Sequence, residues 1–165
     1  MNDDATAIRA VTTKLADEGH QVVLVMHSYG GIPGTESAEE LGCEFRQNAG
    51  KPGGSIALVY LAAYFLTKGM GHMVLGGLIF HDKTAAFETF YNDFTPEMDP
   101  LGWASRLQTQ SATPWAGELG YESYRDIPTT YLFCTQDRAI PIDIQKKFVG
   151  VCGGKDLNHY VWCWA

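Results

Sequence analysis

The stretch that decides the fold is QVVLVMHSYGG, which runs from Gln21 to Gly31. Its first part is a run of mostly β-branched residues without helical alternation, and this predicts a strand buried on both faces inside a parallel sheet. Ser28 stands where that run ends. Gly30 and Gly31 lack a Cβ, so the backbone can turn sharply there and start a helix close to the strand. The pattern predicts a strand, a tight turn that presents one hydroxyl group, and a helix.

Composition limits the classes of protein to which the chain can belong. Of its 165 residues, 45% are hydrophobic and 19% are charged, which is typical of one globular domain with a packed core. The formal net charge of -7, with no cluster of Lys and Arg, argues against a surface for nucleic acid or an anionic membrane and favours small neutral substrates. No apolar run reaches membrane-spanning length. The first residues do not resemble a signal peptide, so we expect a cytoplasmic location.

Neither a metal nor a cofactor is expected from the motifs. The chain contains four cysteines, Cys43, Cys134, Cys152 and Cys163. They form no C-x-x-C pair, so we expect reduced thiols. His159 and Cys163 have the spacing of one pair of zinc ligands, but a fourth ligand is not apparent. The glycines between residues 69 and 77 lack the G-x-G-x-x-G spacing, and residues 50–52 do not form a phosphate loop because Pro52 replaces Ser or Thr.

Patterns around the opening stretch predict alternating helices and strands. In chain order these are a helix over residues 3–18, the strand that ends before Ser28, a helix from Gly31 to about Asn48, a strand within Ile56–Leu66, a strand within Ile127–Asp137 and a helix over Pro141–Val149. Pro33 is tolerated in the first turn of its helix, and Ala38, Leu41 and Phe45 are expected to face inward. Strands connected through a helix in this way form a parallel sheet.

The residues MHSYGG resemble the nucleophile elbow of the α/β-hydrolase superfamily, near its esterase and hydroxynitrile-lyase-like branch. The usual pattern is G-x-S-x-G. Here Met26 replaces the first glycine, whereas His27, Ser28, Tyr29 and Gly30 fit the pattern. Because the position two before the serine packs beneath the turn, Met26 must find space for its flexible side chain. The resemblance implies an α/β fold, a partial α/β-hydrolase fold in which a parallel sheet is flanked by helices and carries a helical cap insertion.

The same resemblance assigns roles to two further segments of a single domain that spans residues 1–165. CTQDRAIP, which begins at Cys134, resembles the acid loop of this branch, where Asp137 would hold the catalytic histidine. An aspartate after a strand is otherwise usually a turn former. Residues 67–126 change to glycine, methionine and aromatic residues, and they resemble the cap that covers the serine and forms apolar walls. Surface helices without a special role are the alternative.

The chain departs from the family pattern at the remaining catalytic positions. His159 is the only histidine after Asp137 and is therefore the candidate base, although it lacks the usual glycine-histidine-serine context. The backbone N–H of Tyr29 is the implied oxyanion donor, while the second donor belongs to an early loop that has no place here. Loss of one donor costs roughly a hundred- to a thousandfold in turnover. We expect a domain truncated at both ends with impaired activity, and a structural role for His27.

Three functions are compatible with these residues. The first is a serine hydrolase that cleaves carboxylic esters of small apolar molecules through an acyl-enzyme. The second is a lyase acting on a cyanohydrin-like substrate, which would use the same three residue types. The third is an inactive, truncated pseudo-hydrolase that acts as a binding or interaction module. A sheet edge left unpaired by truncation would invite a homodimer.

Overall fold

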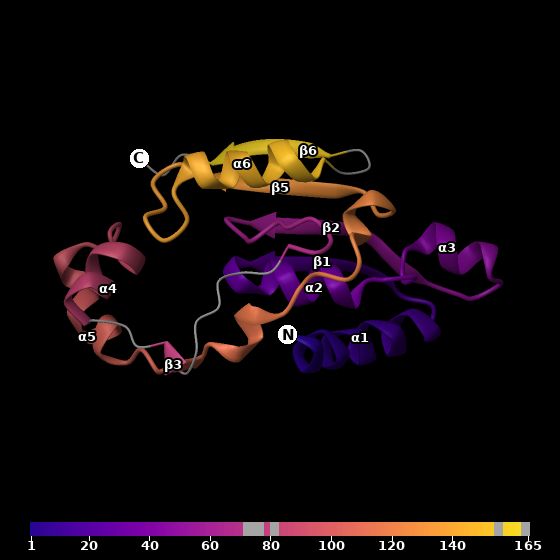
Figure 1. Cartoon of the computed structure of the whole chain (residues 1–165), viewed down its shortest axis with the longest axis horizontal. Helices are drawn as coiled ribbons and strands as arrows, with labels where there is room; N and C mark the ends of the chain where they lie inside the picture. Colours follow the sequence, from indigo (N-terminus) through magenta and orange to yellow (C-terminus); the bar gives the residue numbers. More distant parts are fainter. Residues whose placement is uncertain (71–77, 80–82, 154–156, 163–165) are drawn as a thin grey trace.

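The chain forms a four-stranded parallel sheet in a computed structural model. The structure describes residues 1–70, 78–79, 83–153 and 157–162. The sheet has the order β1-β2-β5-β6 (Figure 1). Its strands are β1 (Gln21–His27), β2 (Gly54–Leu61), β5 (Thr129–Cys134) and β6 (Asn158–Trp162). A separate antiparallel pair joins β3 (Leu78–Ile79) to β4 (Gln110–Ser111). The predicted parallel sheet is confirmed.

Helices connect these strands and extend beyond the sheet. They are α1 (Asn2–Asp17), α2 (Gly31–Ser37), α3 (Cys43–Asn48), α4 (Lys83–Phe90), α5 (Pro100–Ser105) and α6 (Ile142–Cys152). Short 3-10 turns occur at η1 (Ser28–Gly30), η2 (Pro96–Met98), η3 (Thr113–Ala116) and η4 (Ser123–Arg125). Figure 1 shows α4 and α5 at the end of the molecule toward which the strands point, and α3 at the opposite end.

The core lies on one face of the sheet, beneath α2 and α6. Tyr60 on β2 and Tyr131 on β5 are fully buried and stack with their ring centroids 6.1 Å apart. Burial of a phenol is tolerated only when its hydroxyl has a partner. The Tyr60 hydroxyl pairs with Thr35 Oγ1 on α2 at 2.6 Å, and the Tyr131 hydroxyl donates to the Ala63 carbonyl at 2.7 Å. The first bond fixes α2 against the centre of the sheet, and the second fixes the segment that follows β2.

The prediction that the first strand is buried on both faces is wrong. Val23 and Val25 are 46% and 61% exposed, whereas Met26, which points to the other face, is buried. The reason is tertiary, because the face of the sheet on which Val23 and Val25 lie is open to solvent over the described residues. A run of β-branched residues indicates a strand but does not show which neighbours will cover it.

The single helix predicted from Gly31 to about Asn48 is also wrong, since the chain forms two shorter helices there. Glu40 has a left-handed backbone with a φ of 57°, which ends the helical path. The Leu41 carbonyl then accepts the backbone N–H of Ser55 at 2.7 Å. A continuous helix would use that carbonyl internally, so pairing with β2 excludes it. Phe45, predicted to face inward, is 49% exposed, whereas Ala38 and Leu41 are buried as predicted.

The two ends of the predicted cap, residues 67–126, lie beside each other. Gly69 donates its backbone N–H to the Leu119 carbonyl at 2.9 Å, and the Leu119 N–H donates to the Met70 carbonyl at 3.3 Å. Residues 71–77 and 80–82 of this segment lie outside the described residues. The reciprocal bonds close the segment into a loop with a paired stem.

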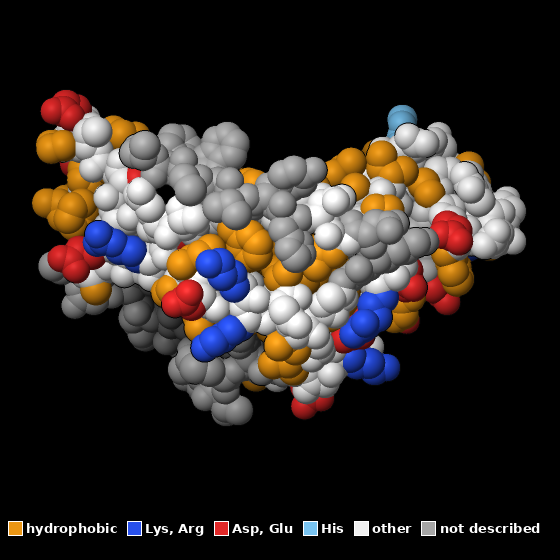
Figure 2. Space-filling view, turned by 90° about the horizontal axis from the view of Figure 1, so that it is seen from above, with side chains coloured by type: hydrophobic (Ala, Val, Ile, Leu, Met, Phe, Trp, Pro, Cys, Tyr) orange, Lys and Arg blue, Asp and Glu red, His pale blue; other side chains and the backbone are white. Residues whose placement is uncertain are grey.

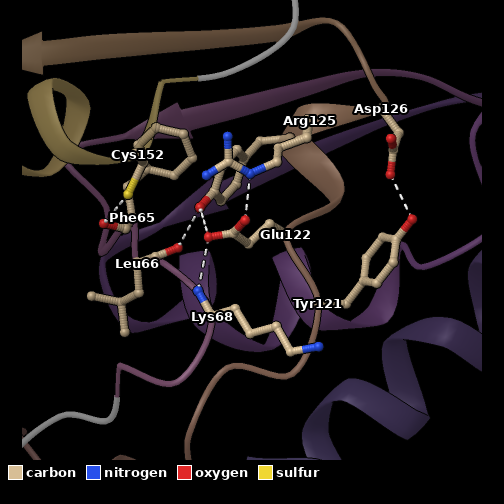
Figure 3. Close-up of polar contacts among 9 residues, drawn as sticks. Phe65, Leu66, Lys68, Tyr121, Glu122, Arg125, Asp126 and Cys152 are labelled. Carbon is tan, nitrogen blue, oxygen red and sulfur yellow. Dashed lines mark hydrogen bonds and ion pairs between the residues drawn. The ribbon is translucent and has the colours of Figure 1, made fainter.

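Glu122 joins this stem to the loop that follows β2 (Figure 3). Its Oε1 atom accepts the Lys68 backbone N–H at 2.8 Å and the Tyr124 hydroxyl at 2.9 Å. The Tyr124 hydroxyl also lies 2.9 Å from the Leu66 carbonyl, and Arg125 forms an ion pair with Glu122. The Arg125 bond, followed by the Lys68 and Tyr124 bonds, lowers the pKa of Glu122 to about 2 against its burial. The carboxylate therefore anchors both ends of the segment.

The molecular surface carries mixed charge. Figure 2 shows Lys and Arg side chains interspersed with acidic and hydrophobic ones, without a continuous basic patch on the described part of that face. Among the described helices, none combines the length and the apolarity that crossing a membrane requires.

Candidate active site

Ser28 stands on a strained turn at the end of β1. Its φ is 51°, in the left-handed region that non-glycine residues rarely adopt. The Ser28 carbonyl accepts the Tyr64 backbone N–H at 3.0 Å, so the turn is bonded to the segment after β2. Ala62, at the end of β2, also has a positive φ of 38°. Two adjacent strands therefore end in sharp turns, and strain of this kind is concentrated at functional sites.

Close packing explains why position 31, at the start of α2, is a glycine. A Cβ at Gly31 would lie well inside van der Waals contact with the Tyr64 carbonyl oxygen. Gly34, one turn further along α2, lies under the sulfur of Met26 in the same way. Met26 thus finds its space above Gly34. The small residue expected in the strand is replaced by a small residue in the facing helix.

Tyr29 turns its side chain away from the serine. Its hydroxyl donates to Asp4 Oδ2 at 2.7 Å, and its ring centroid lies 4.8 Å from that of Trp115. Burial, and secondarily the bond to Asp4, raise the pKa of Tyr29. A phenol held in this way cannot turn toward the serine. The backbone N–H is therefore the group that Tyr29 can offer to an oxyanion.

Asp137 lies in the turn that follows β5. Its Oδ1 atom accepts the backbone N–H groups of Ala139 at 2.8 Å and Ile140 at 2.9 Å. These bonds fix the carboxylate and leave Oδ2 without a hydrogen bond from the described residues. Burial, and secondarily the charge of Asp137, raise the pKa of the nearby Cys134 thiol. Asp137 is thus a turn former that also presents one free oxygen.

One cavity of about 330 Å³ brings the two predicted residues together. Its lining comprises His27, Ser28, Ala62, Thr89, Phe90, Asn92, Asp93, Cys134, Thr135, Gln136, Asp137, Ala139 and Ile140. Ser28 comes from the end of β1 and Asp137 from beyond the end of β5. The carboxyl ends of parallel strands meet at one edge of a sheet, which is where α/β proteins place their ligand sites.

Residues within 89–93 of the predicted cap segment line one side of this cavity, through contacts that the sequence did not reveal. Asn92, which follows α4, donates from Nδ2 to the Gln136 carbonyl at 3.2 Å. The Arg138 guanidinium donates to the Glu88 carbonyl at 3.4 Å. Both bonds join the end of α4 to the loop that carries Asp137. No spacing in the sequence indicates this contact, because it depends on how residues about 45 positions apart fold together.

The His159 backbone does not lie at the carboxyl edge of the sheet, where Ser28 lies. Strand β6 places its backbone opposite Tyr131, whereas the last pair of the two strands is Cys134 with Trp162. Three residues of strand span about 10 Å, so the His159 backbone lies well before the edge that holds Ser28. Its side chain lies outside the described part of the structure, and its role as the base stays a prediction.

His27 borders the cavity beside Ser28 and is exposed, whereas sequence analysis assigned it a structural role. It is the one histidine among the lining residues that the structure describes. An alternating strand pattern places successive side chains on opposite faces, but it does not reveal that the cavity extends around the end of β1. His27 is therefore a second histidine, beside His159, to be considered as a base for Ser28.

No metal centre is found in the described residues, where His, Cys, Asp and Glu form no group of three or more suited to one. Cys43, Cys134 and Cys152 carry free thiols. Cys163, one of the two residues with zinc-ligand spacing, lies outside the description.

Comparison with known proteins extends these observations. The chain is 28% identical over 173 residues to the probable hydrolase R7 of a Phoma species, a match that covers 96% of this chain and 68% of the relative. It is 28% identical over 161 residues to the alpha/beta hydrolase nvfD of Aspergillus novofumigatus, which covers 88% of this chain and 63% of that relative. The chain therefore spans about two thirds of the length of these relatives.

A solved structure shows the same fold at low sequence identity. A variant of polyneuridine aldehyde esterase superposes with a TM-score of 0.67 at 16% identity, covering 94% of this chain and 69% of the esterase. The model of the Alpha/beta hydrolase family matches residues 2–161. Because that match runs from α1 into β6 and takes in both Ser28 and Asp137, this protein belongs to the alpha/beta hydrolase family.

Proposed function

We propose that the chain is a serine hydrolase that cleaves carboxylic esters of small apolar molecules. The observation that carries the proposal is that one and the same cavity is lined by Ser28, on a strained turn, and by Asp137, whose carboxylate is held by two backbone N–H groups. A nucleophile after β1 and an orienting acid after β5, both at the carboxyl edge of the same parallel sheet, form two thirds of a triad. The cavity volume suits a small substrate.

The chemistry follows from these positions. A histidine takes the proton of Ser28 Oγ, which bonds to the ester carbonyl carbon, and the backbone N–H of Tyr29 donates to the oxyanion. The bond to the alcohol then breaks, and the alcohol leaves with the proton held by the histidine. Water, deprotonated by the same base, cleaves the acyl-enzyme and returns a proton to Ser28. Oδ2 of Asp137 orients the imidazole. His159 and His27 are the two candidates for the base.

The relatives support this proposal by name. The two fungal relatives are described as hydrolases, and the superposed structure is that of an esterase. Their names support hydrolysis as the general type of reaction, whereas the proposed serine mechanism is argued from the residues that line the cavity.

The proposal is tested by treating the purified chain with a fluorophosphonate probe and weighing the intact protein. Ser28→Ala, checked for folding by circular dichroism, is the control. We expect one probe adduct on the parent chain and none on Ser28→Ala. His159→Ala and His27→Ala then identify the base, because loss of the true base slows labelling by about a hundredfold or more. A folded parent chain that stays unlabelled contradicts the proposal.

A binding module is the second candidate function. The placement of the His159 backbone near the start of β6, away from the edge where Ser28 lies, favours it. In that case the cavity would hold an ester or acid without cleaving it. Titration of folded but unlabelled protein with short esters, followed by NMR shifts of the cavity residues, distinguishes this function from an empty cavity. A trial with cyanohydrin substrates examines the lyase alternative.

A further inference from the structure

The described lining of the cavity carries carboxylates without a matching Lys or Arg. Asp93, which follows α4, and Asp137, in the loop after β5, are both lining residues. The described lining contains no Lys or Arg, and His27 is the one group there that can become cationic. Arg138 is adjacent to Asp137 in sequence, but its guanidinium is bonded to the Glu88 carbonyl outside the lining. The charge of Arg138 therefore acts on the cavity from a greater distance than the two carboxylates do.

The two carboxylates differ in what they already bind. Asp137 has its Oδ1 atom engaged by two backbone N–H groups, and the proposed triad assigns its other oxygen to the base. Asp93 makes no hydrogen bond or ion pair with the described part of the chain and is exposed. It is thus the carboxylate that remains for a ligand. Phe90 contributes an aromatic ring to the same wall, and such rings attract cations through their faces.

We propose that the cavity selects esters carrying a quaternary or protonated amine over neutral isosteres and disfavours anionic ones, with Asp93 as the residue that determines this preference. The inference rests on the proposed ester hydrolysis and revises its substrate class, because the preferred ester of the same cavity then carries a cationic group and not an apolar one. A carboxylate on the cap side attracts a cationic substituent while the ester carbonyl lies at Ser28. At separations of about 4 Å, one such charge changes binding by roughly fivefold in water and by more where water is excluded.

The test uses three acetate esters of similar size and different charge: acetylcholine, 3,3-dimethylbutyl acetate and 4-acetoxybutanoate. We expect kcat/KM to fall in that order, by about three- to tenfold at each step. Asp93→Asn should remove most of the difference, and Asp93→Lys should reverse it. Glu97→Gln removes an exposed cap carboxylate outside the lining, and it should leave the order unchanged. Equal kcat/KM values for the three esters, or an order that Asp93→Asn does not alter, overturn the inference.

A binding measurement separates this inference from the proposed function. Ser28→Ala is titrated with the same three esters and binding is followed by isothermal calorimetry, which needs no turnover. Preferential binding of acetylcholine that is lost in Asp93→Asn supports the charge preference even if no ester is cleaved. Labelling of Ser28 by the fluorophosphonate together with equal or undetectable binding of the three esters contradicts the charge preference and leaves the hydrolase proposal standing.

Discussion

Single residues at the serine turn are constrained by backbone contacts. Ser28 keeps a left-handed backbone because its carbonyl is bonded to the segment after β2 and the following residues must turn into α2. A non-glycine residue in such a conformation costs about 1–3 kcal/mol. That cost is offset by burial elsewhere in the fold. The turn therefore depends on the absence of a side chain at Gly31, where the start of α2 meets the segment after β2.

The two adjacent glycines should respond oppositely to a methyl group. Gly31→Ala places a Cβ against the Tyr64 carbonyl, which cannot withdraw because the Tyr64 N–H is bonded to Ser28. We expect a loss of roughly 1–3 kcal/mol of unfolding free energy and of fluorophosphonate labelling. Gly30→Ala meets nothing within 4 Å, so it should be neutral or slightly stabilising. Urea denaturation of both variants measures this, and equal effects would contradict the contact.

Met26 and Gly34 should be energetically coupled. Gly34→Ala brings its Cβ against the Met26 sulfur, so the variant should be destabilised. In a Met26→Ala background that sulfur is absent, and the same change should cost less by about 0.5–3 kcal/mol. A double-mutant cycle from denaturant midpoints measures the coupling. Additive effects would show that Met26 relaxes into other space.

At the scale of elements, the segment of residues 67–126 is bonded to the rest of the fold at both its stem and its far end. The anchor includes Glu36 on α2, whose Oε2 atom accepts the backbone N–H groups of Gly120 at 2.7 Å and Tyr121 at 3.0 Å. The tip is joined to the acid loop through the exposed contacts of Asn92 and Arg138. The stem therefore sets where the wall of the cavity stands relative to α2, the helix that follows Ser28.

Glu122 should make the free energy of unfolding depend on pH in the acidic range. Its folded pKa of about 2 lies below the usual value of about 4.3 for an unfolded glutamate. The stabilisation is therefore fully present above about pH 5 and is lost as the pH falls toward 2, because the unfolded chain takes up a proton first. Glu122→Gln should lower the unfolding free energy by about 1–3 kcal/mol at pH 7. Its difference from the parent chain should shrink on acidification.

Chemical denaturation at several pH values between 7 and 2 measures that difference. Glu97→Gln, which changes an exposed carboxylate of the cap, is the control for general charge effects. A difference between Glu122→Gln and the parent chain that stays constant over this range would show that the carboxylate is not the stabilising group.

At the scale of the whole molecule, β1 is an edge strand without a charged residue. Edges of this kind pair with other chains unless they are protected. Antiparallel pairing of two copies about Leu24 would place Val23 of each copy opposite Val25 of the other. We propose a homodimer through this edge. Static light scattering should show a rising molecular mass between about 10 and 200 µM, the concentrations at which weak pairing becomes visible.

A lysine on the edge should prevent this pairing. Val25→Lys introduces a charge at a position that is 61% exposed, so the fold should be retained while the mass stays that of a monomer. Val151→Lys, on α6 and 66% exposed, is the matched control and should associate like the parent chain. Association that persists in Val25→Lys would place the interface elsewhere.

Local chemistry in the sequence determined the elements that form the site. Periodicity and turn residues depend on neighbours a few positions away, so the strand before Ser28, the turn at Gly30 and Gly31, and the strand that leads to Asp137 could be predicted. The first helix and the parallel sheet follow for the same reason. These features bring a hydroxyl group and a carboxylate to one edge of the sheet.

Only the tertiary structure decided which surfaces are covered and which residues meet. Contacts between distant segments decided five features. These are the exposure of β1, the break after α2, the packing of Met26 on Gly34, the register of His159 in β6 and the bond from Asn92 to the loop that carries Asp137. Burial is a property of the neighbours that the chain brings together, and those neighbours leave no periodic trace in the local sequence. The sequence by itself therefore determined the strand and turn that carry Ser28, while the fold decided the shape and charge of the cavity around it.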